Sequence, residues 1–259
     1  MLNIILARLK QGHRTMKYPD GLPPELSARF RGRPVLDSAK CSAGCHACAD
    51  ACPTGAIEFT GSEVRIDLGK CIFCSDCVNV CADKAITFTG DHRLAVRNRQ
   101  DLLLSQNQQE LQLAAALDAK MKKLFGRSLK LRQVSAGGCN ACEADTNVLG
   151  TLAWDLGRFG IQFVASPRHA DGLLITGPVT QNMKLALKKT YDAVAEPKVV
   201  IAVGTCAISG GPYINHEQVN NGVGDIVPVD LYIPGCPPHP LTILDGLLRF
   251  IDRKIAADS

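Results

Sequence analysis

Twelve cysteines are the residues of this 259-residue chain that promise the most specific chemistry. Thiolates bind iron, zinc and other soft metals, or pair as disulfides, and their spacing helps to tell these uses apart. Three 4Fe-4S clusters with four thiolate ligands each would use all twelve cysteines. The cysteines therefore point to metal or cluster binding, and the rest of the chain must fold so that their side chains are brought together.

One pair of cysteines stands in the segment Cys139-Asn140-Ala141-Cys142, directly after Gly137-Gly138. Glycine has no Cβ, so the backbone at this point can come close to a bound cluster. A C-x-x-C pair alone fits an iron–sulfur cluster, a zinc site or a redox dithiol. The other ten cysteines have to separate these interpretations.

Eight cysteines lie in an internal repeat within residues 38–90. The first copy carries Cys41, Cys45, Cys48 and Cys52, and the second carries Cys71, Cys74, Cys77 and Cys81. Each run is followed by the pattern Ala-Ile-x-Phe, which predicts a short strand. The second copy has the C-x2-C-x2-C-x3-C spacing of bacterial two-cluster ferredoxins, which the repeat resembles, although Ala82 stands where proline is usual.

The first copy departs from this spacing, because three residues instead of two separate Cys41 from Cys45. Either Cys41 reaches its cluster through a one-residue bulge, or that cluster has an unusual ligand. His46, inside the run, is the candidate replacement. The total of twelve cysteines favours Cys41.

The resemblance to two-cluster ferredoxins implies crossed ligation, in which the fourth cysteine of each run serves the other cluster. One cluster then takes Cys41, Cys45, Cys48 and Cys81. The other takes Cys71, Cys74, Cys77 and Cys52. A pair of zinc sites is the alternative, but zinc sites typically use two separated cysteine pairs.

The composition sets the expected surroundings. Hydrophobic residues make up 46% of the chain and charged residues 21%, which suits a buried core. No apolar run reaches the roughly 18–20 residues that span a bilayer, and no secretory signal is recognised at the start. We therefore expect a cytoplasmic protein, in which structural disulfides are rare. A net charge of +4 is too small to indicate nucleic-acid binding.

The remaining four cysteines are expected at one edge of a sheet. Strands are predicted at residues 129–134, 161–165, 172–176, 199–203 and 227–233, and helices at 145–159, 179–194 and 238–253. The strands are near-continuous runs of Val, Ile and Leu, as in an open α/β fold whose parallel sheet is covered on both faces. Such sheets bind ligands beyond the carboxyl ends of their strands. The four cysteines that follow these strand ends, and are expected to converge on a third 4Fe-4S cluster, are Cys139, Cys142, Cys206 and Cys236.

Two further segments are expected to connect or dock these parts. Residues 1–33 hold seven Lys and Arg against two acidic side chains, a balance of +5. This basic arm either docks on a membrane-embedded partner or anionic lipid, or packs on the body of its own chain. Apolar residues recur at helical intervals after Asp101, a plausible N-cap, and predict a helical linker up to about residue 125.

Residues 128–255 resemble the small, cluster-bearing subunit shared by respiratory complex I and NiFe hydrogenases. The motifs that carry this resemblance are Gly137–Glu143, Ser166–Asp171, Thr176–Thr180, Gly204-Thr205-Cys206 and Ile233–Pro238. Complex I subunits of this kind have two adjacent cysteines at the first motif. This chain has C-x-x-C, as the membrane-bound group 4 hydrogenases do, including those of formate hydrogenlyase. The first half resembles the two-cluster ferredoxin subunit of the same complexes, so two usually separate chains are fused here.

The resemblance implies four regions. They are a basic arm at 1–37 that docks on the membrane arm, an α+β two-cluster ferredoxin domain at 38–95, a helical linker at 96–127, and an α/β open parallel-sheet (flavodoxin-like) domain at 128–259. It also implies an oxidoreductase subunit that relays electrons through three 4Fe-4S clusters to or from a catalytic centre on a separate large subunit. The implied location is peripheral, on the cytoplasmic side of the inner membrane.

The implied partners are the large catalytic subunit, membrane-arm subunits and a redox donor such as ferredoxin or formate dehydrogenase, with no nucleic acid. Two alternatives stay open. One is the equivalent subunit of a complex-I-like quinone or ferredoxin oxidoreductase that lacks nickel. The other is a free-standing soluble ferredoxin-like carrier.

Other residues near the cysteines have less specific signals. Glu143 is a candidate proton relay beside Cys142, or else a helix N-terminal acid stabilised by the helix dipole. His169 and His239 are candidates for tuning the third cluster or for contacting a partner. The segment 204–211 is rich in glycine but lacks the phosphate-binding motifs, which speaks against nucleotide binding.

Overall fold

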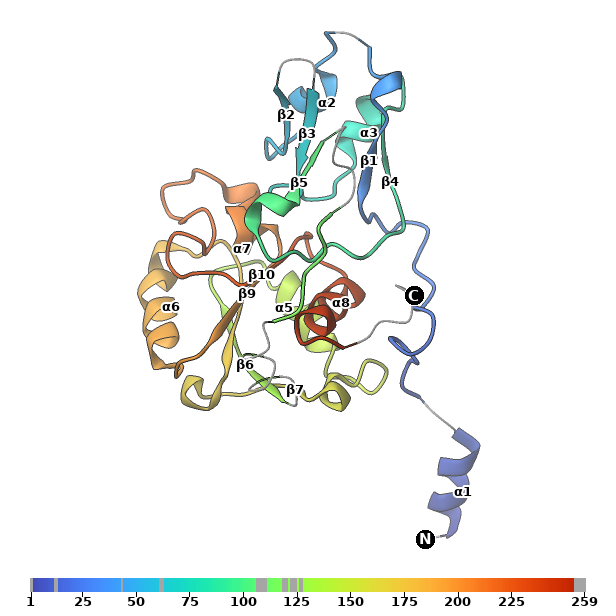
Figure 1. Ribbon diagram of the computed structural model, residues 1–259, viewed down its shortest axis with the longest axis vertical. Coiled ribbons are helices and arrows are strands. Elements are labelled where there is room, and N and C mark those ends of the chain that lie inside the picture. The colour runs from blue at the N-terminus through green and yellow to red at the C-terminus, as the bar shows by residue number, and fades with distance from the viewer. Residues whose placement is uncertain are drawn as a thin grey trace.

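The computed structural model describes residues 2–11, 14–42, 44–60, 63–105, 111–117, 121, 125 and 128–253. The cysteine repeat forms a small part at the top of Figure 1, and a larger α/β part lies below it. The N-terminal helix α1 (Leu2–Gln11) extends away from both parts. From this helix the chain runs along the larger part before it enters the smaller one.

The small part is built from short antiparallel strands. Its elements are β1 (Pro34–Leu36), α2 (Ala47–Asp50), β2 (Ile57–Thr60), β3 (Glu63–Asp67), α3 (Asp76–Val80), β4 (Ile86–Phe88) and β5 (Leu103–Ser105). β1 pairs with β4, and a second sheet has the order β2-β3-β5. The strand predicted after each cysteine run is present, and Ile57 and Ile86 of these strands are buried. Burial of these apolar side chains fixes each cysteine run against the sheets.

The larger part contains a five-stranded sheet in which every neighbouring pair is parallel. Its strands are β6 (Leu129–Ser135), β7 (Ile161–Phe163), β8 (Gly172–Thr176), β9 (Val199–Val203) and β10 (Leu231–Ile233), in the order β10-β9-β8-β6-β7. Its helices are α5 (Ala141–Val148), α6 (Gln181–Ala193), α7 (Thr205–Ser209) and α8 (Pro240–Phe250). The prediction of an α/β domain with a parallel sheet is confirmed.

Helices cover both faces of this sheet, because successive side chains of a strand point to opposite faces. Ile175 of β8 packs in one hydrophobic cluster with Leu187 of α6, whereas its neighbour Leu174 packs in another cluster with Leu244 of α8. Figure 1 accordingly shows α6 on one side of the sheet and α5 and α8 on the other. The first cluster continues to Ile66 in the small part, so the two parts share a core.

The described residues also form short 3-10 turns, one of which lies within a predicted helix. They are Ser38–Lys40, Arg99–Leu102, Leu156–Phe159, Pro167–His169 and Gly211–Tyr213. The helix predicted at 145–159 is two elements: α5 begins earlier, at Ala141, and ends at Val148 before Gly150. Glycine is a poor helix former, so the interruption follows from the sequence.

The connection at 96–127 departs from the predicted helix at residues 103–105 and 111–117, whereas the described residues Met121 and Phe125 are helical. Leu103–Ser105 form β5, which pairs with β3 and buries Leu104. Residues 111–117 are irregular, with the amide of Ala114 donating to the carbonyl of Ala95 and that of Leu117 to Phe250. Burial against both parts outweighs the helical spacing of the apolar residues. The rest of the predicted helix lies outside the described residues, apart from positions 121 and 125.

Where it is described, the basic arm packs against the rest of the chain only after residue 14. Beyond it the arm packs on the chain itself: the Arg158 guanidinium donates to the carbonyls of Met16 (2.7 Å) and Tyr18 (2.5 Å). In α1, by contrast, the side chains of Leu2 and Leu9 are 70% and 73% exposed. Among the described residues, none of the helices has both the length and the apolar character that a membrane span requires.

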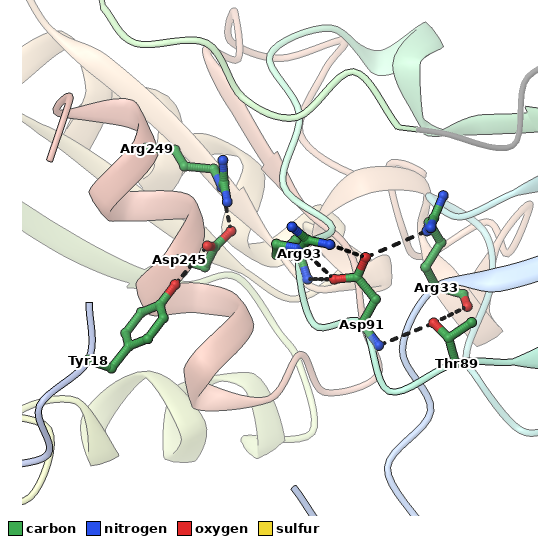
Figure 2. Close-up of polar contacts among 7 residues, drawn as sticks. All are labelled: Tyr18, Arg33, Thr89, Asp91, Arg93, Asp245 and Arg249. Atoms are coloured by element: carbon green, nitrogen blue, oxygen red, sulfur yellow. Dashed lines mark hydrogen bonds and ion pairs between the residues drawn. The ribbon is translucent and has the colours of Figure 1, made fainter. Parts of the chain in front are cut away.

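Two carboxylates, one fully buried and one partly buried, hold the arm and the small part in place (Figure 2). Asp245 of α8 is fully buried and accepts hydrogen bonds from the Tyr18 hydroxyl (2.8 Å) and Arg249 Nε (2.8 Å). The Asp91 carboxylate accepts two hydrogen bonds from the Arg93 guanidinium (2.8 and 3.0 Å) and one from the Arg93 amide (3.0 Å), and Arg33 Nε lies 3.7 Å from it. Charge-assisted bonds of this kind are the stronger ones, so they fix the path of residues 18–33.

Candidate metal centres

The structure brings the predicted thiols together in three groups of four. The first group is Cys41, Cys45, Cys48 and Cys81, which line one pocket of about 210 Å³. The second group is Cys52, Cys71, Cys74 and Cys77, which line a narrower pocket of about 20 Å³. The third group is Cys139, Cys142, Cys206 and Cys236. These four lie close enough for the charge of one thiolate to raise the pKa of another. Cys52 and Cys81 each lie with the other run, which is the exchange that crossed ligation requires.

Backbone amides point at sulfur in the first two groups. The amide of Ala56 donates to Cys52 Sγ (3.2 Å), and the amide of Ala85 donates to Cys81 Sγ (3.2 Å), four residues on in both copies. The amide of Phe73 donates to Cys71 Sγ at 3.4 Å. Such bonds stabilise thiolate charge and are one of the features that tune iron–sulfur clusters.

Glycines make room for the sulfur atoms of the third group. Gly204, at the end of β9, has φ +88°, and a Cβ there would lie 2.5 Å from Cys142 Sγ. Gly211 has φ +55°, and a Cβ there would lie 2.9 Å from Cys206 Sγ. Both positions therefore require glycine for its backbone conformation and for its missing side chain.

Burial raises the pKa of several of these thiols, with neighbouring cysteine charges adding to it. The pKa rises to about 12 for Cys71, about 11 for Cys77 and about 12 for Cys206. The pKa of Cys142 is raised for the same reasons. A cationic metal centre would favour the thiolates and displace their protons, so these groups fit such a centre.

Within the described part of the chain, no three or more His, Cys, Asp or Glu side chains are arranged to hold a single metal ion. The choice between iron–sulfur clusters and zinc at the four-thiol groups stays a prediction.

The three groups lie in a row. The charge of Cys48 in the first group is close enough to raise the pKa of Cys77 in the second group. The charge of Cys74 in the second group likewise raises the pKa of Cys236 in the third group. The order therefore runs from the first group, through the second, to the third. Both ends of this row reach the surface, since Cys45 of the first group and Cys139 and Cys236 of the third group are exposed.

Two of the candidate histidines lie away from the thiol pockets. His46 is exposed, packs edge-on against Phe59 at 4.2 Å, and does not line the pocket that Cys41 lines. Ala43, inside the longer spacing, lies outside the described residues. His169 is exposed in a 3-10 turn.

His239 is closer to the third group. With Cys236 it lines a cavity of about 220 Å³, and its Nδ1 accepts the amide of Leu241 (3.1 Å) at the start of α8. Burial lowers the pKa of His239, which favours the neutral ring. Its position beside a predicted ligand is compatible with the tuning role, which stays a prediction.

Glu143 is buried behind the third group. Its Oε1 accepts hydrogen bonds from the hydroxyls of Ser135 and Thr176, both at 2.6 Å. These two residues end the neighbouring strands β6 and β8 and stand opposite each other in the register. Sequence reasoning missed both, because the pairing of β6 with β8 is not visible in the sequence. The proton-relay role of Glu143 stays a prediction beside this structural one.

Gly204→Ala is expected to prevent a metal centre from assembling in the third group and to spare the other two. The added methyl group would occupy the space of Cys142 Sγ, and φ +88° disfavours alanine. Iron per chain and EPR spectra after reconstitution are the measurements. Gly224→Ala is the matched control, because a Cβ there meets nothing within 4 Å. Full iron content in Gly204→Ala would contradict the expectation.

Comparison with known proteins shows to which family the chain belongs. Residues 33–82 match the family model of the 4Fe-4S dicluster domain, and residues 139–250 match that of the NADH ubiquinone oxidoreductase 20 Kd subunit. The probable membrane-bound hydrogenase subunit mbhJ of Pyrococcus furiosus is 39% identical over 135 residues, which are 52% of this chain and 81% of that protein. The chain belongs to the 20 Kd subunit family.

Two further matches are a curated protein and a solved structure. A subunit of the NADH-quinone oxidoreductase of Phocaeicola vulgatus is 45% identical over 133 residues, which are 51% of this chain and 66% of that protein. A chain in the structure of the membrane-bound sulfane sulfur reductase, an archaeal respiratory membrane complex, matches with 33% identity and TM-score 0.46, over 52% of this chain and 75% of that one.

The predicted resemblance is confirmed. A ferredoxin-type dicluster domain precedes the 20 Kd subunit domain in one chain, and the relatives are named as subunits of oxidoreductases. Iron–sulfur cofactors are supported by the two family models. The number of clusters and the individual ligands stay predictions.

Proposed function

We propose that this chain is the electron-transfer subunit of a membrane-bound NiFe hydrogenase-type complex, in which electrons pass to or from a catalytic centre on a separate large subunit. The observation that carries the proposal is the row of three four-thiol groups. The C-x-x-C spacing at 139–142 and the hydrogenase relative favour hydrogenase over complex I.

Each thiol group is assigned one 4Fe-4S cluster, which when bound supplies one-electron redox chemistry. Cys41, Cys45, Cys48 and Cys81 hold the first, Cys52, Cys71, Cys74 and Cys77 the second, and Cys139, Cys142, Cys206 and Cys236 the third. The protein's own part is to fix the thiols, to aim amides at their sulfurs, and to keep the second and third groups close together.

The domain boundaries belong to the same proposal. We assign 1–37 to the docking arm, 38–95 to the ferredoxin domain, 96–127 to a connector and 128–259 to the 20 Kd subunit domain. Numbered within the last domain, its strand order is 2-1-3-4-5, which supports the flavodoxin-like assignment.

The chain is further proposed to sit on the cytoplasmic side of the inner membrane, against membrane-arm subunits. Helix α1 supports this, because Leu2, Ile5, Leu6 and Leu9 share one face at helical spacing and are 46–73% exposed. Lys10 and the basic arm that follows suit an anionic membrane surface.

Leu9→Glu is expected to release the protein from native membranes at lower salt than the parent. Burial of a leucine side chain contributes about 1.5–3 kcal/mol, so membrane affinity should fall about tenfold or more. Ile4→Glu is the matched control, since Ile4 is also 73% exposed but lies on the other side of the helix. Salt washes of membranes measure the effect, and equal release of both variants would argue against docking through this face.

The proposed function is tested by isolating the native complex in mild detergent and assaying its nickel and its hydrogen-dependent dye reduction. A large subunit with nickel and hydrogenase activity, copurifying with this chain, is the expected result. A nickel-free complex active with quinone or ferredoxin would favour the complex-I-like alternative, which the 45% identical NADH-quinone oxidoreductase relative supports. A water-soluble chain with intact clusters and no large partner would contradict both and favour a soluble carrier.

A further inference from the structure

Helix α7 presents two buried hydroxyls to the small part of the molecule. Thr205 is 1% exposed and Ser209 is 7% exposed, and they lie one helical turn apart. Both donate hydrogen bonds to backbone carbonyls of the loop at residues 69–71, on the other side of the boundary between the two parts. The two hydroxyls therefore bind the same loop, but their acceptors belong to different residues of it.

The Thr205 hydroxyl reaches a residue of the second thiol group. Its Oγ1 donates to the carbonyl of Cys71 at 2.7 Å and also lies 3.1 Å from the carbonyl of Gly235. Thr205 precedes Cys206, and Gly235 precedes Cys236, so both flank cysteines of the third group. The Thr205 amide adds a second bond to the Gly235 carbonyl at 2.9 Å. One hydroxyl thus joins the backbone of a thiol in the second group to two ligand segments of the third.

The loop that carries Cys71 is held firmly, which gives this contact a fixed geometry. The Asp67 carboxylate accepts two hydrogen bonds from Arg99 (2.8 and 2.6 Å) and one from the amide of Gly69 (2.8 Å). The carbonyl of Asp67 accepts the Cys71 amide at 3.0 Å. The bidentate arginine pair makes this arrangement specific as well as stable.

Ser209 makes the comparable contact without touching a thiol residue. Its hydroxyl donates to the carbonyl of Gly69 at 2.8 Å and lies 3.2 Å from the carbonyl of Thr205. It therefore contributes to the docking of the two parts as Thr205 does. The difference between the two residues isolates the contact with Cys71.

We propose that Thr205 is a positioning residue for electron transfer between the second and third thiol groups, because its hydroxyl connects their backbones directly. The inference rests on the proposed function. Clusters held by the two groups would exchange one electron in this step, so that one would be oxidised as the other is reduced. No bond to the protein forms or breaks, and no proton is required.

The test compares the full-length reconstituted chain with Thr205→Val, Thr205→Ala, Thr205→Ser and Ser209→Ala. Each protein is photoreduced with deazaflavin and freeze-quenched, and EPR follows the signal of the third group over time. The spectrum of Cys142→Ala serves to assign the signals. We expect the rate to fall about tenfold in the Val and Ala variants, because small displacements of positioned groups change rates by orders of magnitude. Thr205→Ser should regain most of the rate.

Ser209→Ala is the matched control and should transfer electrons at the parent rate, although it loses thermal stability as Thr205→Val does. Parent-like rates in both Thr205→Val and Thr205→Ala would overturn the proposal. Equal slowing in Ser209→Ala, or no recovery in Thr205→Ser, would also overturn it, because domain docking would then explain the effect. A parent protein with three reduced signals but no transfer between these groups would refute the proposed function, and the role of Thr205 with it.

Discussion

Cys142→Ala is expected to remove the EPR signal of the third group and to leave those of the first two. Cys142 is buried in α5, among thiols that come from three separate segments of the larger part. With one of four ligands gone, iron per chain should fall from about twelve to about eight, since each 4Fe-4S cluster contributes four. Iron analysis and EPR after anaerobic reconstitution measure the loss.

The experiment also tests whether the third group binds its metal centre independently of the first two. The ferredoxin part shares a hydrophobic cluster with the larger part, including Ile66 and Ile175. Cys45→Ala is the reciprocal control, because Cys45 is exposed in the first group and should leave the third signal intact. Loss of all signals in Cys142→Ala would show that the two parts fold and bind metal as one unit.

Asp245→Ala is expected to cause the largest loss of stability among single changes outside the thiol groups. The substitution leaves the Arg249 guanidinium, whose side chain is 12% exposed, and the buried Tyr18 hydroxyl without this acceptor (Figure 2). Removing one partner of a buried ion pair costs about 3–5 kcal/mol. At roughly 2–4 °C per kcal/mol for a protein of this size, the melting temperature should fall by about 10 °C.

Tyr18→Phe provides the graded control for Asp245. It removes one hydrogen bond to a charged group, worth about 1.5–3 kcal/mol, and leaves the Asp245–Arg249 pair in place. Thermal unfolding followed by circular dichroism should rank parent, Tyr18→Phe and Asp245→Ala in order of falling stability. An Asp245→Ala protein as stable as the parent would mean that the pair contributes no net stabilisation.

The local sequence pattern was sufficient to predict the parallel sheet and the meeting of the last four cysteines, whereas the grouping of the first eight was predicted from the family resemblance. The apolar runs at 172–176 and 199–203 became β8 and β9 with the same bounds, because a strand covered on both faces needs apolar residues throughout. The cysteines then met at the carboxyl edge, as chain direction in a parallel sheet requires.

Long-range pairing was beyond the sequence. Tyr18 and Asp245 are 227 positions apart, and Thr205 and Cys71 are 134 apart, so nothing local links their side chains. The first part of the helix predicted after Asp101 was wrong for a related reason: Leu102 and Leu104 are buried in a turn and an edge strand. Tertiary burial decided their conformation.

The central claim is that three four-thiol groups each hold one 4Fe-4S cluster. Its most direct test is the iron, acid-labile sulfide and zinc content of the full-length chain after anaerobic purification. Twelve cysteines in three groups of four predict about twelve irons, about twelve sulfides and no zinc per chain. About eight irons would contradict the claim and point first to the group with the longer Cys41–Cys45 spacing, and stoichiometric zinc would contradict the iron–sulfur assignment itself.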